Sequence, residues 1–319
     1  MNLPQLKIDN LTARLPIIQG GMAVRISTGA LAGAVAATGA IGIIGASGMA
    51  FDELRREIAI ARAKAQGGIV GINIMFAARE FWGIVETAIK EKIDLIITGA
   101  GFSRDIFKVG HDGNTPIVSI VSSARLAETA AKLGAAAIVV EGKEAGGHLG
   151  TDRSIWDIFP EVRKAVNLPV IAAGGIMHGV DIVRALKIGA NGVQMATRFV
   201  LAEECAASAA YKKLYQTATQ DDVVIIQSPV GLPGRAIKNV FVNKILSGTA
   251  PAPVGCDFCL KKCSLKYCII KALVNSQQGD VDNGVVFSGE YVWKLKDRTI
   301  KPAAKIVAEI VEEVAQVPA

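Results

Sequence analysis

The chain of 319 residues is 51% hydrophobic and 5% aromatic, so it is long and apolar enough to bury the core of one large domain with a small extra lobe. Its formal net charge of +6 comes from scattered basic residues, without a basic tail or a basic helix interleaved with aromatics, which argues against nucleic-acid binding. The start, MNLPQLKIDN, lacks the apolar core of a secretory signal, and the most apolar stretch, residues 28–48, is typical of a helix followed by a strand. We therefore expect a cytoplasmic protein without membrane contact.

Short β-branched runs alternate with longer helical patterns along the first two thirds of the chain. The expected strands are Ile17–Gln19, Ile41–Ile44, Ile69–Ile74, Leu95–Thr98, Pro116–Ile120, Ala137–Val140, Val170–Ala173 and Gly192–Met195. Helical segments such as residues 52–66, 123–133 and 180–188 lie between them. This alternation predicts an α/β fold with a parallel sheet, and eight units favour closure into a (β/α)₈ TIM barrel over an open doubly wound sheet.

The pattern changes after about residue 218. Residues 223–255 contain several prolines and glycines, a cysteine-rich segment follows, and a last helix is expected from about residue 302 to residue 314. We predict three parts: a barrel core over residues 1–218, a loop-rich substrate and cysteine lobe over 219–300, and a C-terminal helix over 301–319 that packs on the barrel.

The functional residues are expected in the loops that follow the strands, because barrels of this kind carry their active sites at the C-terminal ends of the strands. Gly174 and Gly175 follow the seventh strand and precede a helix, which suits a phosphate: glycine lets the backbone approach the anion, and free N–H groups at the helix start point towards it. Thr197, just beyond the eighth strand, can add a hydroxyl. A plain turn is the alternative for the glycine pair, and the placement after consecutive strands favours phosphate.

His148 is the most promising of the three histidines. It lies in a glycine-rich loop after the sixth strand, beside Glu141 and Glu144, where a histidine can serve as general acid or base near neutral pH. Position alone leaves a structural role equally open. His111 is expected in a polar turn, and His178 is expected to begin a helix as a supporting or capping residue.

Four of the five cysteines are clustered near the C-terminus: Cys256, Cys259, Cys263 and Cys268, with the spacing C-x₂-C-x₃-C-x₄-C. In a chain without an export signal, this clustering favours ligation of a metal or cluster over disulfides. The spacing matches neither the usual zinc finger nor the bacterial ferredoxin, so reduced structural cysteines remain the alternative. Cys205 lies outside the cluster and is expected to be an inert thiol.

Six segments, in order, carry a resemblance to a known family: "LPIIQGGM", "GAIGIIGASGM", "GINIM", "VVEGKEAGGHLG", "LPVIAAGGI" and "GANGVQMATRF". They resemble the nitronate monooxygenase family, formerly the 2-nitropropane dioxygenases, which also contains flavin-dependent enoyl-acyl-carrier-protein reductases of the same fold. The resemblance runs from about Pro16 to Arg198 and continues more weakly through "SPVGLPGRAIKN". It implies a TIM barrel that binds FMN, with a small second domain.

The resemblance also implies roles for matching positions. His148 would be the catalytic histidine: a base in the monooxygenases, and a neighbour of the reacting enoyl group and flavin in the reductases. The residues that would contact FMN are Gly21, Met22, Asn73, Glu141, Gly146, Gly174, Gly175, Gln194, Met195, Ala196 and Thr197. Within this resemblance, the cysteines are interpreted as ligands of a [4Fe–4S] cluster, because a redox centre beside FMN would extend the electron path of the flavin towards a partner. Zinc is the alternative metal for these cysteines.

Three functions follow from these expectations. The first is oxidation of alkyl nitronates with O₂, the second is NAD(P)H-dependent reduction of an enoyl thioester, and the third is a flavin and iron–sulfur electron-transfer module. An IMP-dehydrogenase-like barrel is disfavoured, because no cysteine nucleophile occurs between the sixth and seventh strands. No GxGxxG follows a strand, so NAD(P)H would bind only transiently as a co-substrate. The expected partner is a small-molecule or acyl-thioester substrate; a homodimer and a redox partner protein are left open.

Overall fold

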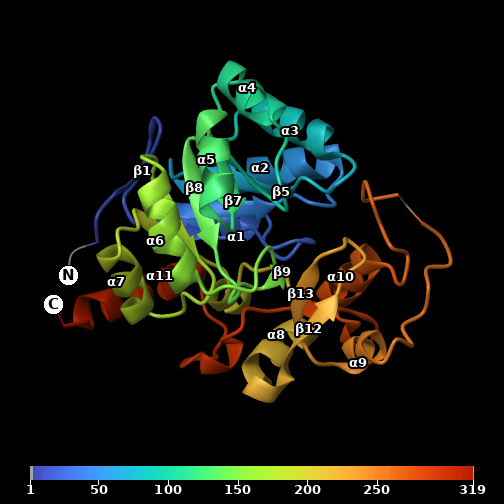
Figure 1. Ribbon diagram of the computed structural model, residues 1–319. Helices are drawn as coiled ribbons and strands as arrows, with labels where there is room; N and C mark the ends of the chain where they lie inside the picture. The colour runs from blue at the N-terminus through green and yellow to red at the C-terminus, as the bar shows by residue number, and fades with distance from the viewer. Residues whose placement is uncertain (1–2, 257, 319) are drawn as a thin grey trace.

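The computed structural model describes residues 3–256 and 258–318, and its centre is a closed barrel of eight parallel strands (Figure 1). The order around the barrel is β10-β11-β3-β4-β5-β6-β7-β8, and β8 pairs with β10 to close it. The strands are β3 (Ile17–Gln19), β4 (Ile41–Gly45), β5 (Val70–Met75), β6 (Leu95–Gly99), β7 (Ile117–Val121), β8 (Ala137–Glu141), β10 (Val170–Ala173) and β11 (Gly192–Met195). The predicted TIM barrel is therefore confirmed, with the strand ends at or next to the expected residues.

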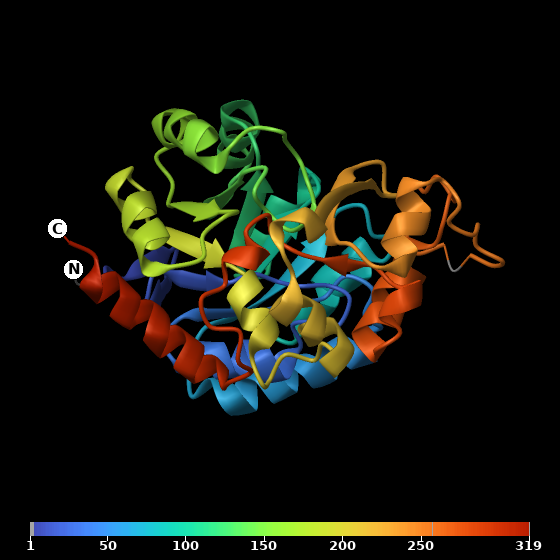
Figure 2. The same ribbon diagram turned by 90° about the horizontal axis from the view of Figure 1, so that it is seen from below.

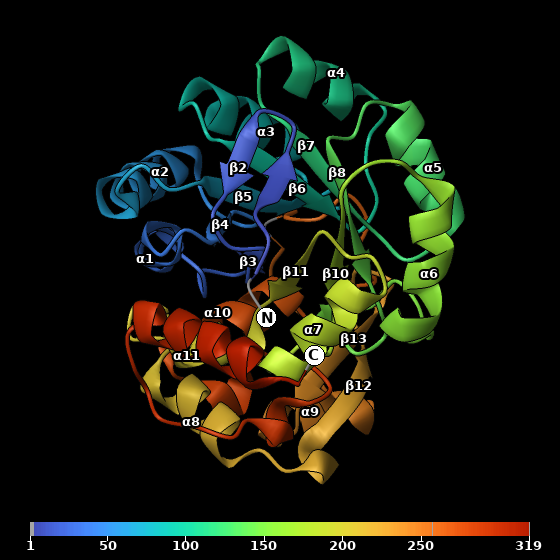
Figure 3. The same ribbon diagram turned by 90° about the vertical axis from the view of Figure 1, so that its left-hand side faces the viewer.

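Helices follow the strands and form the outer layer of the barrel (Figure 3). They are α1 (Gly29–Ala37), α2 (Phe51–Ala65), α3 (Phe81–Lys90), α4 (Asp105–Asp112), α5 (Ala124–Lys132), α6 (Ile155–Ala165) and α7 (Gly179–Lys187). In α2 the buried residues Leu54, Ile58 and Ala61 recur at helical spacing, so one face packs on the sheet. Ser123 and Ser154 cap α5 and α6 with side-chain hydrogen bonds. His111 lies in the last turn of α4, and not in the expected polar turn.

An N-terminal hairpin, β1 (Leu6–Ile8) and β2 (Leu11–Ala13), closes the end of the barrel at which the strands begin (Figure 3). Its buried side chains Leu6 and Ile8 belong to the same apolar cluster as Ile18 inside the barrel. The sequence analysis did not predict this hairpin. The hairpin thus packs on the apolar side chains inside the barrel at this end.

The chain beyond β11 builds a lobe beside this open end (Figure 1). Its elements are η1 (Thr197–Leu201), α8 (Ala209–Thr217), η2 (Gln220–Asp222), β12 (Val223–Gln227), β13 (Pro233–Ile237), α9 (Val240–Leu246), α10 (Ile269–Gln278), η3 (Val281–Asn283), β14 (Val286–Phe287) and η4 (Val292–Lys294). A two-residue strand from the barrel loops, β9 (Gly147–His148), pairs with β13. This pairing joins the loop that carries His148 to the lobe.

The last helix, α11 (Ala303–Gln316), returns to the barrel and packs along α7 and α1 (Figure 2). Its buried residues Ile306, Val307, Ile310 and Val314 form the apolar stripe that the sequence predicts for this segment. In the described ranges, no helix combines the length and the apolar character needed to cross a membrane.

Candidate active site

A cavity of about 440 Å³ opens at the C-terminal ends of the barrel strands and is covered on one side by the lobe. Its volume lies in the range of small-molecule and cofactor sites. The structure brings together every catalytic and cofactor-binding residue named from the sequence. The cavity is lined by Gly21, Met22, Asn73, Glu141, Gly146, His148, Gly174, Gly175, Gln194, Met195, Ala196 and Thr197.

The glycine pair after β10 lies beside the start of η1 after β11. The two segments are neighbours because Ala173 pairs with Gln194 in the barrel. Gly174 and Gly175 have φ angles of +91° and +71°, which side chains rarely adopt, and a Cβ at Gly174 would come within 3.1 Å of the Ala145 backbone nitrogen. The segment thus presents bare backbone to the cavity, which suits an anion such as a phosphate.

Two buried polar side-chain atoms at the cavity lack a hydrogen-bond partner among the residues that the structure describes. Gln194 Oε1 and Ser288 Oγ are buried and form no hydrogen bond within the described residues. Leaving such a group unpaired costs about 1–3 kcal/mol, so buried polar groups without partners indicate a ligand with complementary donors and acceptors. Together with the glycine segment, they fit a phosphorylated ligand that has a polar ring system, as FMN does.

Glu141 ends β8 and lines the cavity. Burial raises the pKa of its carboxyl group from 4.5 to about 7. A carboxyl group with this pKa exchanges protons near neutral pH, and such perturbed groups in cavities are characteristic of functional sites.

His148 sits in β9, where it pairs with Gly234 of β13. Its Nε2 atom lies 2.8 Å from the Ser228 hydroxyl, and its ring meets the edge of Phe287 with 5.1 Å between the centroids. Burial lowers the pKa of His148 from 6.5 to about 4, so the imidazole is neutral at physiological pH. A neutral imidazole beside a cavity can accept a proton from a bound substrate.

Ser228 is a residue of this site that the sequence analysis did not name, as are Phe287 and Ser288. It follows β12 and begins the turn into β13, in which Gly231 N donates to Ser228 O and Ser228 N donates to Leu232 O. The signal was present, because Ser228 opens the weaker motif "SPVGLPGRAIKN". Its contact with His148 spans 80 residues of sequence, which no local pattern reveals.

Glu144 has a structural part in the same loop. Its carboxylate accepts hydrogen bonds from Ser154 Oγ at 2.6 Å and from Ile155 N at 3.0 Å, and it therefore fixes the loop on the start of α6. From the lobe, Arg235 donates to the Lys143 carbonyl at 2.7 Å. These contacts hold the segment between Glu141 and His148 from both sides.

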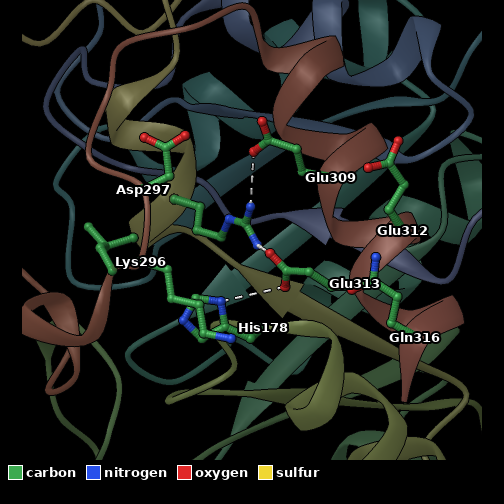
Figure 4. A pocket seen from close by; sticks show the side chains of 9 residues that line it. His178, Lys296, Asp297, Glu309, Glu312, Glu313 and Gln316 are labelled. Atoms are coloured by element: carbon green, nitrogen blue, oxygen red, sulfur yellow. Dashed lines mark hydrogen bonds and ion pairs between the residues drawn. The ribbon is translucent and has the colours of Figure 1, made fainter. Parts of the chain in front are cut away.

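A second, smaller cavity of about 260 Å³ lies between α11, the segment 295–297 and the residue that precedes α7, His178, and it is lined mainly by charged side chains (Figure 4). His178 occupies the N-cap position of α7, so the helix begins where the sequence predicts. Glu313 accepts hydrogen bonds from Gly179 N at 2.8 Å and from Arg198 at 2.7 Å, and lies 3.5 Å from His178 Nδ1. Burial by itself acts to raise the pKa of the Glu313 carboxyl group. The hydrogen bonds from His178 and Gly179 N and the positive charge of Arg198 outweigh this effect, so the pKa is lowered to about 2. This network anchors the last helix to the loops after β10 and β11.

The cysteine cluster lies apart from both cavities. Its backbone joins the loop after β5, since Arg79 N donates to the Cys259 carbonyl at 3.0 Å and Leu260 forms a bridge with Ala78. Within the described part of the chain, no three Cys, His, Asp or Glu side chains are arranged to hold a metal ion. The geometry thus gives no support to the expected ligation by Cys256, Cys259, Cys263 and Cys268. Cys205 is buried, and burial raises the pKa of its thiol to about 11, so it is unreactive.

Comparison with known proteins places the chain in a family. The nitronate monooxygenase family profile matches residues 5–82 and 59–313. The chain belongs to the nitronate monooxygenase family. FabK from Thermotoga maritima has a similar structure, with a TM-score of 0.85 and 31% identity over 95% of this chain and 94% of that chain. Nitroalkane oxidase from Streptomyces ansochromogenes, at 22% identity, shares the fold with a TM-score of 0.80 over 95% of this chain and 96% of that chain.

Curated relatives include a (3aS,4S,5R,7aS)-5-hydroxy-7a-methyl-1-oxo-octahydro-1H-indene-4-carboxyl-CoA dehydrogenase of Mycobacterium tuberculosis, 31% identical over 73% of this chain. The chain spans 66% of the length of that relative and 64% of the corresponding Rhodococcus jostii protein. A probable nitronate monooxygenase of Staphylococcus aureus is 26% identical over 96% of both chains.

Proposed function

We propose that this member of the nitronate monooxygenase family is an FMN-dependent oxidoreductase that oxidises alkyl nitronates with O₂. The observation that carries the proposal is the neutral imidazole of His148 in the cavity formed by the predicted FMN-binding loops. Family membership and the fold shared with nitroalkane oxidase support it. Bound FMN would supply the acceptor for the substrate's electrons and their transfer to O₂.

The protein's own residues have distinct parts in this proposal. Gly174, Gly175 and Thr197 would hold the phosphate, and Gln194 and Ser288 would use their unpaired atoms on the flavin ring. His148 would accept a proton from the carbon next to the nitro group, which converts a neutral nitroalkane into the nitronate. The apolar wall at Met75, Phe102 and Leu232 would exclude water from the substrate chain.

The identity of the cofactor can be tested on the purified protein. We expect the purified protein to be yellow and to release FMN on denaturation, identified by chromatography. FAD in its place, or no flavin uptake after incubation with FMN, would contradict the proposal. Anaerobic stopped-flow with a nitronate should bleach the flavin, and readmitted O₂ should restore its colour with consumption of the nitronate.

A second candidate is reduction of an enoyl thioester with NAD(P)H. It is favoured by FabK, which is 31% identical over 95% of this chain, and by the relatives named as carboxyl-CoA dehydrogenases. The same stopped-flow experiment separates the two functions. Rapid bleaching by NADH or NADPH, with return of the colour on addition of an enoyl-CoA under anaerobic conditions, would establish the reductase and displace the oxidase.

We propose separately that the four clustered cysteines bind a [4Fe–4S] cluster or, failing that, one zinc ion. The support is their spacing in the sequence, C-x₂-C-x₃-C-x₄-C. Lys261, Lys262 and Lys266 would offset thiolate charge. Anaerobic preparations would contain about four iron and four sulfide per chain for the cluster, or about one zinc and no sulfide.

A further inference from the structure

Residues 258–261 of the cysteine segment, which we call the strap, lie antiparallel against the loop that follows β5. Cys259 and Leu260 take part through their backbones, and the Lys261 N–H donates to the Ala77 carbonyl at 3.0 Å. Backbone hydrogen bonds on both sides of a bridge are the pattern of a two-stranded antiparallel ladder. The strap lines neither cavity, but it holds this loop in a defined position.

The side chain of Lys261 contacts one residue of that loop, Phe76. Its ammonium group lies 3.7 Å from the centroid of the Phe76 ring and donates a hydrogen bond to the Phe76 carbonyl at 2.7 Å. A cation over an aromatic face is attracted by the electrons of the ring, so the lysine holds both the ring and the backbone of this residue. Phe81 also packs on the ring, with 5.2 Å between the centroids. Phe76 is thus fixed by Lys261 and Phe81.

Phe76 in turn supports the cavity wall formed by the loop after β6. Its backbone N–H donates to the Gly99 carbonyl at 3.0 Å, and its Cδ1 atom lies 3.6 Å from the position that a Cβ on Gly101 would take. Gly99, Gly101 and Phe102 line the cavity, whereas Phe76 does not. The ring therefore packs on this wall without itself lining the cavity.

The turn in this wall depends on support from its neighbours. Ala100 has a φ of +54°, which residues other than glycine rarely adopt, and Gly101 follows with a φ of +93°. Strained backbone of this kind persists only where surrounding contacts hold it. Phe76 supplies a contact on Gly101, and Phe107 packs on the ring of Phe102 with 5.5 Å between the centroids. Loss of the support at Phe76 should therefore let the turn relax.

We propose that Lys261 is a positioning residue that determines the size of the substrate that the cavity accepts. By holding Phe76 against Gly101, it fixes the apolar wall at Met75 and Phe102, on which the alkyl chain of the substrate would lie. The inference rests on the proposed function only for the identity of that chain. The strap thereby acts on substrate selection from outside the cavity.

Hydrogen exchange of the FMN-loaded protein tests the support without any substrate. Lys261 is exposed, so Lys261→Ala should fold, and the Phe76 ring should be free to move into the space of the lost side chain. We expect amide exchange over residues 99–104 to rise about tenfold. The matched control is Lys262→Ala, since Lys262 is exposed and has no hydrogen bond, ion pair or cation–π contact with the described residues. Unchanged exchange over residues 99–104 in Lys261→Ala would overturn the proposal.

The length of the accepted ligand gives a second readout. Straight-chain carboxylates are unreactive planar anions like the nitronates, and their binding can be followed by the change in flavin absorbance. Lys261→Ala should bind the shortest carboxylate as the wild-type protein does, and longer ones more tightly, by about fourfold for each methylene group newly admitted. Lys261→Arg keeps a cation for the ring and should restore the wild-type dependence on length.

Turnover separates this inference from the proposed function. With alkyl nitronates, Lys261→Ala should keep kcat for the shortest substrate and lower KM for the longer ones. A wild-type protein that oxidises no nitronate refutes the proposed function, and the exchange over residues 99–104 still decides the role of Lys261. Nitronate oxidation with the same exchange and the same dependence on chain length in both proteins refutes the role of Lys261 alone.

Discussion

His148 and His178 are both largely shielded from solvent, but their surroundings differ in kind. His148 has a neutral hydroxyl, Ser228, and an aromatic ring, Phe287, as neighbours. His178 stands 3.5 Å from the Glu313 carboxylate and 3.2 Å from the Lys294 carbonyl. Without a nearby anion, burial keeps His148 neutral and able to take up a proton, whereas the charge network around His178 serves to hold two helices together. The comparison shows that a histidine's role follows from its partners more than from its burial.

The largest expected effect is on catalysis. His148→Ala should fold and retain FMN but lose about 10²–10⁴-fold in kcat/KM, because a positioned acid–base group contributes that much. His178→Ala, the matched control from the second cavity, should keep kcat/KM. Steady-state assays and flavin absorbance measure both. An unchanged kcat/KM in His148→Ala with every active substrate would remove the distinction between the two histidines.

The next effect is on stability and concerns the second cavity. Glu313→Gln should lower the free energy of unfolding by about 1–3 kcal/mol, because it weakens charge-assisted hydrogen bonds to Arg198, which is 9% exposed, and to the start of α7. Urea denaturation measures the change. Glu312→Gln is the control, since Glu312 lines the same cavity but forms no hydrogen bond or ion pair with the described residues. Equal stability of the two variants would show that the network contributes nothing.

The two sites should also differ in the pH range over which they affect stability. The pKa of His148 falls from 6.5 in the unfolded chain to about 4 in the folded protein, so the contribution of His148 to stability should decline as pH drops from about 6.5 to about 4. Glu141, whose pKa is raised from 4.5 to about 7, contributes the opposite change as pH drops from about 7 to about 4.5. The pKa of Glu313 falls from 4.5 to about 2, so its contribution is present above 4.5 and is lost as pH falls towards 2.

Unfolding midpoints measured against pH test this separation. His148→Ala should gain stability relative to the wild-type protein as pH drops from about 6.5 to about 4, because it no longer contains the buried imidazole. Glu313→Gln should remove the decline in the lower range. If both variants keep the wild-type pH dependence, other groups control the acid stability, and the contrast between the two sites holds only for catalysis.

The smallest expected effect on turnover comes from the cysteine segment. Cys259→Ser should leave kcat nearly unchanged, because none of the four clustered cysteines lines the main cavity. The same variant should lose bound iron or zinc and should destabilise the lobe if the ligation proposal is right. Metal analysis beside the assay measures this. If neither metal is present in the wild-type protein and all four thiols react freely with a thiol reagent, the proposal fails.

Local patterns in the sequence were sufficient to predict the barrel. Val- and Ile-rich runs such as Val170–Ala173 are buried on both faces, and this favours parallel strands under helices wherever such runs occur. The loop residues were predictable for the same reason: once the strands are known, parallel pairing gathers their C-terminal ends, and Gly174 and Thr197 become neighbours. The hairpin Leu6–Ala13 was not predicted, because strands of three residues are too short to show a clear alternation of apolar and polar residues.

The partners of the reactive groups were decided only by tertiary structure. The sequence singled out His148 but left its role open, because nothing near it in the chain specifies what its ring contacts. Folding brings Ser228 to Nε2 from 80 residues away and places Phe287 against the ring, and the burial that results keeps the imidazole neutral. Desolvation and hydrogen bonding depend on which atoms surround a group in space, so residue identity alone sets only the ordinary pKa, and the fold sets the shift.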